Sequence, residues 1–118
     1  MPNLENIRLW VTALRSGDYR QGIGSLYNIS SGTYCCLGVA CEVARANGVA
    51  LEIADDPEPG GDRAYDNESA FLPSKVQAWL GVDSRNPIID GNHATEWNDG
   101  LCASLDKIAD AIEREYLA

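Results

Sequence analysis

The chain has 118 residues, of which 45% are apolar, a length and composition that predict one globular domain over residues 1–118. Acidic residues outnumber basic ones by 18 to 9, so the formal charge is −9. A surface of this sign repels nucleic acids and anionic membranes, and no segment approaches the roughly 20 apolar residues of a membrane span. General nucleic-acid binding and membrane insertion are therefore disfavoured, while the charge could mimic a polyanion or serve only solubility.

The N-terminal residues Met1–Glu5 lack the basic region and apolar run of a signal peptide, which predicts a cytoplasmic protein. Thiols stay reduced in the cytoplasm, so the even number of cysteines does not indicate disulfides. We expect four free and largely buried thiols, at Cys35, Cys36, Cys41 and Cys102.

A first helix is predicted from about Leu4 to Ser16, because apolar residues repeat there at helical spacing. Asn3 can cap its start, and Gly17 suits the left-handed position after its end. The residues of the apolar face are Leu4, Ile7, Trp10, Val11 and Leu14.

The next predicted elements are a small hairpin, with strands at Leu26–Ile29 and Thr33–Cys35, and a second helix. This helix runs from about Cys36 to Asn47, and Gly48 is its stop signal. Small residues dominate its inner face, so another helix can approach closely, and we expect it to be the central helix. Its predicted buried stripe is Val39, Ala40, Val43 and Ala44.

Beyond the central helix, Val49–Ile53 alternates in the manner of a half-buried strand. The residues from Ala54 to Ser69 are rich in Asp, Glu, Pro and Gly, which predicts an exposed acidic loop at about 54–69. Calcium binding is an alternative role for this segment. The acidic spacing does not match a calcium loop with glycine at its sixth position, so the plain loop is preferred.

A short third helix is predicted to begin at Pro73 and to end at Gly81. Asn86–Gly91 then has the composition of a turn, a brief extended segment and a second turn. The inward residues of the third helix are Val76, Trp79 and Leu80.

Ser104 caps a last helix with an unbroken apolar stripe. Its members are Leu105, Ile108, Ala109, Ile112 and Tyr116. Together the segments predict an α+β, mostly helical single domain, with about four helices around a small antiparallel sheet.

Cys35 and Cys36 lie at a predicted strand-to-helix junction, where unpaired N–H groups and the helix dipole favour a thiolate. With His93, and with Asn98 or Asp99 as a third member, they follow the residue order of some cysteine proteases. No local signature of a thiol enzyme surrounds them, and cysteine is among the residue types most often buried. Core packing is therefore preferred, and a cysteine-dependent hydrolase or transferase is the alternative.

No metal or cofactor is predicted. The cysteines lack the spacing of a zinc knuckle, and a single histidine cannot complete a usual ligand set. Gly22–Gly24 is rich in glycine, as phosphate loops are, but it follows a helix rather than a strand and lacks the required lysine. It remains a turn through which the backbone can approach something closely.

Residues 15–21 gather two guanidinium groups, a phenol and an amide at the end of the first helix. Such a group can hold a carboxylate or phosphate by paired hydrogen bonds and stack a ring on its tyrosine. The preferred alternative is a helix end whose arginines pair with acidic neighbours. The residues concerned are Arg15, Ser16, Tyr19, Arg20 and Gln21.

Several motifs occur together along the chain. The first helix ends in Ala13–Gly17, Tyr19-x-Gln21-Gly22 follows, and the central helix opens with Tyr34-Cys35-Cys36-Leu37-Gly38-Val39-x-Cys41-Glu42. In these motifs, and over nearly its whole length, the chain resembles a family of small uncharacterised proteins of tailed bacteriophages and prophages. Similar proteins carry Leu where this chain has Trp97. The resemblance implies a phage origin and the cytoplasm of an infected cell, and it lends no activity.

A later pair, Asn98-Asp99, fits the same resemblance, and the polar positions that match are Arg15, Ser16, Tyr19, Gln21, Asn98 and Asp99. The resemblance implies that they could line a shared pocket.

The resulting prediction is a non-catalytic accessory protein that binds and neutralises a host protein or a small polar ligand such as a signalling nucleotide. The ligand is expected near Arg15, Tyr19, Arg20 and Gln21. No complete catalytic set is visible in the sequence. A monomer and a homo-oligomer both remain open.

Overall fold

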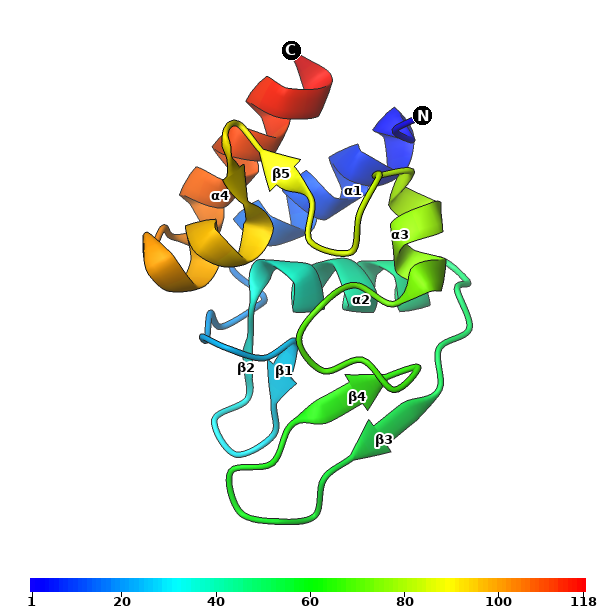
Figure 1. Cartoon of the computed structure of the whole chain (residues 1–118), viewed down its shortest axis with the longest axis vertical. Helices are drawn as coiled ribbons and strands as arrows, with labels where there is room; N and C mark the ends of the chain where they lie inside the picture. Colours follow the sequence, from blue (N-terminus) through cyan, green and yellow to red (C-terminus); the bar gives the residue numbers. More distant parts are fainter.

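The computed structural model describes all residues, 1–118, as one α+β domain of four α-helices and three small antiparallel β-hairpins (Figure 1). This confirms the predicted class and helix number. The helices are α1 (Leu4–Arg15), α2 (Cys36–Ala46), α3 (Ser74–Leu80) and α4 (Leu105–Ile112). The hairpins are β1 (Tyr27–Asn28) with β2 (Thr33–Tyr34), β3 (Ile53–Asp55) with β4 (Arg63–Tyr65), and β5 (Ile88–Ile89) with β6 (Asn92–His93).

Both ends of α1 follow the sequence prediction. The Asn3 side chain accepts a hydrogen bond from the backbone N–H of Asn6, which caps the helix. Ser16 is the C-terminal cap, and Gly17 takes the left-handed conformation with φ +80°. The predicted apolar face is buried at four positions, Ile7, Trp10, Val11 and Leu14, while Leu4 is exposed.

α2 is the central helix, as predicted. It lies across the middle of the molecule, with α1 and α4 on one side and the first two hairpins on the other (Figure 1). Its predicted stripe is fully or almost fully buried, and the burial extends to four more residues, Cys36, Leu37, Gly38 and Cys41. Gly38 faces the chain just before β1, where a methyl group would lie only 1.8 Å from the carbonyl oxygen of Leu26. The lack of a side chain therefore sets how closely these segments approach.

The acidic segment differs from its prediction. Residues 54–69 do not form one exposed loop, because β3 and β4 pair across it with Ile53 opposite Tyr65. Only the tip, residues 54–60, is continuously exposed, and Tyr65 is fully buried. The predicted strand at Val49–Ile53 is also misplaced, since β3 begins only at Ile53. The composition of this segment favoured a loop, but the buried ring of Tyr65 and its cross-strand contact with Ile53 stabilise the short β3–β4 ladder.

The small sheet is in fact three separate hairpins, and the third was only half predicted. Asn86–Gly91 contains β5 and its turn, where Asp90 and Gly91 both have positive φ, but the partner strand β6 was not predicted. One π-helical turn, η1 (Glu96–Gly100), was missed. A second, η2 (Glu113–Leu117), prolongs α4 over the region where the sequence predicted the last helix to continue to Tyr116.

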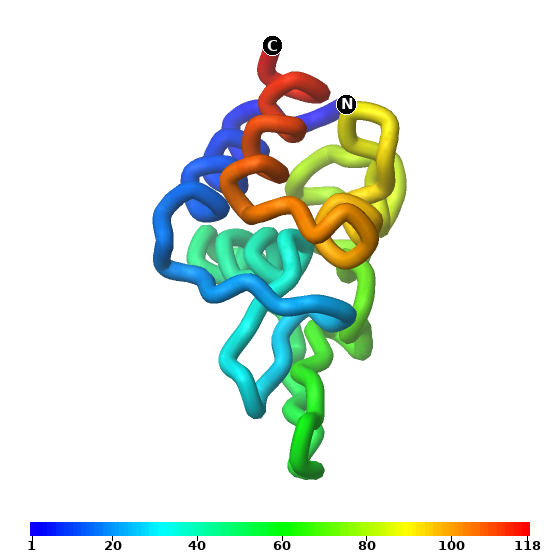
Figure 2. The backbone as a smooth tube through the Cα atoms, turned by 90° about the vertical axis from the view of Figure 1, so that its left-hand side faces the viewer, coloured from blue at the N-terminus to red at the C-terminus, as the bar shows by residue number.

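Seen from the side, α1 lies next to α4 with α2 beneath them, and the β3–β4 hairpin extends away at the far end (Figure 2). The longest dimension, 42 Å, runs along this direction. The core is one cluster of 25 buried apolar residues. None of the helices combines the length and apolar character that crossing a bilayer requires.

Candidate functional site

The predicted segment at the end of α1 borders a shallow depression of about 260 Å³. Three of the predicted residues, Arg15, Tyr19 and Gln21, line it together, whereas Ser16 and Arg20 do not. The opposite wall is the start of α4, which the sequence did not place there. The remaining lining residues are Leu14, Gly17, Ser104, Leu105 and Asp106.

Arg15 is held by α4 and η2. Its Nη2 atom donates hydrogen bonds to the carboxylates of Asp110 and Glu113, the latter at 2.7 Å. These bonds raise the pKa of Arg15 and lower that of Glu113. The preferred sequence interpretation, an arginine paired with acidic neighbours, therefore describes Arg15. Its Nη1 and Nε atoms make no intramolecular hydrogen bond, so they stay available to a ligand.

Tyr19 belongs to a row of three tyrosines. Its ring meets Tyr34 edge-on at 5.2 Å between centroids, and Tyr34 packs against Tyr27 at 4.5 Å. Burial raises the pKa of Tyr19, and the hydroxyl makes no hydrogen bond within the chain. The ring is thus fixed while its polar end remains free.

Arg20 differs from most basic residues of this protein. Six of the nine Lys and Arg side chains form ion pairs with Asp or Glu, and Arg20 is not among them. Its backbone carbonyl accepts from the N–H of Tyr34, which fixes the main chain beside the depression. The three basic side chains without an acidic partner are Arg8, Arg20 and Lys107.

Asn98 forms the centre of a buried amide junction with Gln21. The Oδ1 atom of Asn98 accepts hydrogen bonds from Gln21 Nε2 at 3.0 Å and from the backbone N–H of Cys36 at 3.2 Å. Its Nδ2 atom donates to the Gly22 carbonyl and to Asp99 Oδ1, both at 2.8 Å. Asn98 is only 1% exposed and all its hydrogen-bonding atoms are used within the chain, so it joins the segments around it.

The other matched positions are also committed locally. Asp99 Oδ1 accepts from the N–H of Gly24, and Ser16 Oγ donates to the carbonyl of Ala13 at the end of α1. The implied shared pocket is therefore only partly assembled. Gln21 is the link, since it lines the depression and its amide also donates to Asn98 and Ala103.

The thiols lie where the sequence predicted, at the junction of β2 with α2, but they are buried. Cys35 is 4% exposed and Cys36 is fully buried. Burial raises the pKa of Cys35 to about 11, although backbone N–H groups at the start of α2 lower it in part. The pKa of Cys36 is raised well above its usual value for the same reason. Desolvation thus outweighs the helix dipole.

His93 does not join the thiols. It is exposed in β6, and its Nδ1 lies 2.8 Å from the carbonyl oxygen of Asn86, to which it donates. The Cys36 thiol instead donates to the carbonyl of Ala94 at 3.6 Å. No hydrogen bond connects His93 with Cys35 or Cys36, so the structure does not present the nucleophile and base of the alternative hydrolase. All four cysteines are free, as predicted. Cys102 is exposed, whereas the sequence predicted largely buried thiols.

No three Cys, His, Asp or Glu side chains converge in a way that could hold a metal ion. In the acidic β3–β4 hairpin, Asp55 instead forms an ion pair across the two strands, in which Arg63 Nε donates to Asp55 Oδ1 at 2.7 Å.

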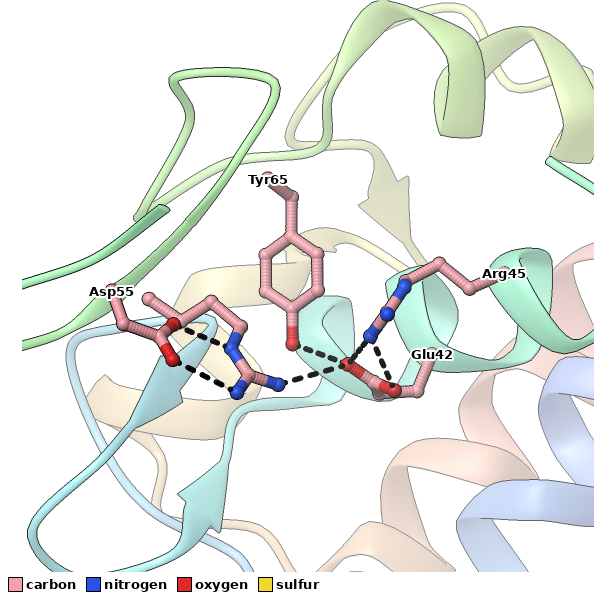
Figure 3. A network of polar contacts seen from close by, with 5 residues as sticks. Glu42, Arg45, Asp55 and Tyr65 are labelled. Carbon is pink, nitrogen blue, oxygen red and sulfur yellow. Dashed lines mark hydrogen bonds and ion pairs between the residues drawn. The ribbon is translucent and has the colours of Figure 1, made fainter. Parts of the chain in front are cut away.

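A charged network that the sequence did not reveal connects this hairpin to α2 (Figure 3). Glu42 Oε2 accepts a 2.6 Å hydrogen bond from the hydroxyl of buried Tyr65, and Arg45 donates to both of its oxygens. Arg63 lies 3.8 Å from the same carboxylate. Each member is satisfied by another, so the network clamps the hairpin to the central helix and leaves little capacity for a ligand.

Fold and site together define a small α+β domain that is held by a buried amide junction and has one shallow polar depression between α1 and α4. Residues 3–116 match the model of a domain of unknown function, DUF8296, and the chain belongs to this family. No curated protein and no solved structure matches the chain.

Proposed function

We propose that this protein is a non-catalytic accessory protein that sequesters a small polar ligand of a host cell in the depression between α1 and α4. The observation that carries the proposal is the convergence of Arg15, Tyr19 and Gln21 on one concave surface. Concave surfaces with a few convergent polar groups are the usual form of ligand sites. At about 260 Å³ the depression suits one ring with its substituents rather than a large cofactor.

The free atoms around the depression indicate the chemistry of the ligand. Arg15 offers two unused nitrogen donors, and Tyr19 offers a hydroxyl. The Gln21 carbonyl oxygen and the Asp106 carboxylate are acceptors. The ligand therefore carries hydrogen-bonding donors and acceptors on a ring, as a nucleotide base and its sugar do.

An anionic group on the ligand needs a cation that is not already neutralised. Arg15 is offset by two carboxylates, so it contributes little net charge. Arg20 and Lys107 have no acidic partner, and each directly adjoins a lining residue in the chain. Neither side chain lines the depression itself, but both are exposed and unpaired, so we expect them to attract a single phosphate on a nucleotide-like ligand.

The resemblance of the Tyr34–Glu42 motif to tailed-phage proteins supports a role during infection. Small phage proteins of this size often act by occupying a target, and this one would act in the cytoplasm of the infected cell. A host protein is the other target predicted from the sequence, and self-association stays a prediction.

The test is a thermal-shift titration with nucleoside monophosphates, the corresponding nucleosides and inorganic phosphate. A ligand that binds only the folded state raises Tm with concentration. We expect nucleotides to raise Tm, and Arg20→Gln and Tyr19→Phe to weaken binding about tenfold, which is roughly 1.4 kcal/mol. Arg8→Gln removes the same charge from another unpaired arginine, on α1, and should change the affinity less than about twofold.

Two outcomes count against the proposal. Equal weakening by Arg8→Gln and Arg20→Gln would show that only net charge matters. A Tm unaffected by every nucleotide, together with a stoichiometric protein partner recovered from infected cells, would replace the small ligand by a host protein.

A further inference from the structure

A second and larger cavity, of about 620 Å³, lies at another part of the surface and shares no residue with the depression. It is open to solvent on one side and is bordered by the first residues of the chain, the segment after α3, the β5–β6 hairpin and η2. The lining residues that bear on its chemistry are Val82, Asp83, Ile88, His93, Glu115 and Tyr116. The volume falls within the range of ordinary small-ligand sites.

The wall of this cavity is firmly built. The N–H of Asn3 donates to the carbonyl of Leu80 at 2.8 Å, and the Asn6 amide donates to the carbonyl of Trp79 at 2.8 Å. Gly81 has φ +71°, and a methyl group there would lie 2.2 Å from the carbonyl oxygen of Met1. The start of the chain is therefore fixed closely over the end of α3.

Two of the ionisable groups that line the cavity are carboxylates without an ion-pair partner, and the others include the N-terminal ammonium of Met1 and the imidazole of His93. Neither Asp83 nor Glu115 forms an ion pair, and no Lys or Arg side chain lines the cavity. One oxygen of Glu115 accepts from the backbone N–H of Asp90, and the other is free. Burial together with the charges of Glu115 and Asp83 raises the pKa of Tyr116 to about 12, which is consistent with a negative field.

Apolar groups stand beside these carboxylates. Ile88 is 56% exposed although it is a large aliphatic residue, and Val82 and the half-buried ring of Tyr116 continue the same lining. The Tyr116 hydroxyl has no hydrogen-bond partner within the chain. The lining thus combines an apolar wall with a carboxylate rim, the pattern that matches an aliphatic stem ending in a cation.

We propose that this cavity binds an alkylammonium or alkylguanidinium group, with the aliphatic stem against Ile88, Val82 and Tyr116 and the cation between Asp83 and Glu115. The group can come from a free amine or from a Lys or Arg side chain of another protein. The site is independent of the proposed nucleotide-like ligand, because no lining residue is common to both.

The test compares n-butylguanidinium with n-butylurea, which has the same shape and no charge, by calorimetric titration of the full chain. The third probe is a Gly-Arg-Gly peptide with an acetylated N-terminus and an amidated C-terminus. Binding of this peptide would indicate that the cavity accepts the arginine side chain of another protein, and not only a free small molecule. We expect the cation to bind at least tenfold more tightly than the urea. The D83N/E115Q double variant should lose this difference, because the Gln side chain still accepts from Asp90 and only the charges are removed.

The matched control is D56N/E58Q, which also removes two negative charges, but from the exposed tip of the β3–β4 hairpin. It should change the affinity for butylguanidinium less than about twofold. Equal losses in both double variants, or equal binding of cation and urea, would overturn the proposal. The two proposals can fail separately. A negative nucleotide titration would not affect the binding of butylguanidinium, and the Arg20→Gln variant is expected to bind butylguanidinium with unchanged affinity.

Discussion

Asn98 joins three segments at the centre of the fold. Its side chain caps the first turn of α2 through the N–H of Cys36, because the N-terminal cap residue Cys35 makes no such bond itself. It also satisfies the carbonyl of Gly22 and the amide of Gln21. One buried side chain thereby fixes η1, the turn after α1 and the start of the central helix.

We expect Asn98→Ala to lower the free energy of unfolding by about 2–4 kcal/mol, because it leaves buried backbone groups without partners. Urea denaturation measures the change. Asn92→Ala is the control, since Asn92 makes no side-chain hydrogen bond in β6. A loss below about 1 kcal/mol would show that water replaces the amide at this junction.

The buried thiols predict a stability that falls at alkaline pH. An unfolded cysteine ionises near pH 8.5, whereas the pKa of Cys35 is raised to about 11 and those of Cys36 and Cys41 are raised well above the usual value. When the pKa of a thiol is higher in the folded than in the unfolded protein, its contribution to the free energy of unfolding is fully present below the unfolded pKa. This contribution is lost as the pH rises toward the folded pKa, because the unfolded thiol then ionises first.

The free energy of unfolding should therefore decrease from about pH 8 to pH 10, as measured by urea denaturation under reducing conditions. Cys35→Ala should make this dependence shallower, and Cys102→Ala should not, because Cys102 is exposed. A free energy that is constant across this range would be incompatible with buried thiols.

At the scale of elements, the tightest packing at any glycine is that of Gly38 in α2 against the chain before β1. Gly38→Ala would place a methyl group against the backbone of Leu26, which cannot move like a flexible side chain. We expect a loss of about 3 kcal/mol or more, or failure to fold. Gly100→Ala is the control, because nothing lies within 4 Å of a methyl group there. Equal melting temperatures for the two variants would contradict the packing described.

The β3–β4 hairpin is held to α2 by the bond between Tyr65 and Glu42 (Figure 3). Tyr65→Phe keeps the buried ring and removes only the hydroxyl, so it should cost about 1.5–3 kcal/mol, the usual value for a hydrogen bond to a charged group. Amide hydrogen exchange should accelerate in residues 53–65 more than in α1. Uniform acceleration along the chain would mean that the hairpin is not a separately clamped unit.

At the scale of the whole molecule, the charge of −9 opposes the compact state. Most basic side chains are already used in ion pairs that are largely exposed, and such pairs contribute little. The excess carboxylates repel one another over distances that salt screens effectively. Added salt should therefore stabilise the folded state, because it weakens the repulsion between carboxylates more than it weakens the ion pairs.

We expect Tm to rise by a few degrees when sodium chloride is increased from low to physiological concentration. The D56N/E58Q variant should respond less, since it carries two fewer negative charges. A Tm that falls with salt would show that the ion pairs, among them those of Arg15, contribute more than the repulsion removes.

Local periodicity and turn chemistry were enough to predict α1, the small hairpin, α2, α3 and α4, together with the caps of α1 and α4. Each of these depends on residues close in sequence, such as Asn3 and Gly17 around α1 or Ser104 before α4. The same reasoning placed the two adjacent thiols at a strand-to-helix junction. It also identified Arg15, Tyr19 and Gln21 as one polar group.

The remaining features required the tertiary structure, because they join residues far apart in the chain. Gln21 meets Asn98 across 77 positions and Arg15 meets Asp110 across 95, and no spacing rule connects such pairs. Whether Cys35 is activated was decided by burial, which exceeds the effect of its helix terminus. The acidic hairpin formed against its composition because Tyr65 is buried and its hydroxyl donates to the distant carboxylate of Glu42. Sequence determined the four helices and most of their ends, whereas long-range packing decided which polar side chains pair within the chain and which stay without an intramolecular partner.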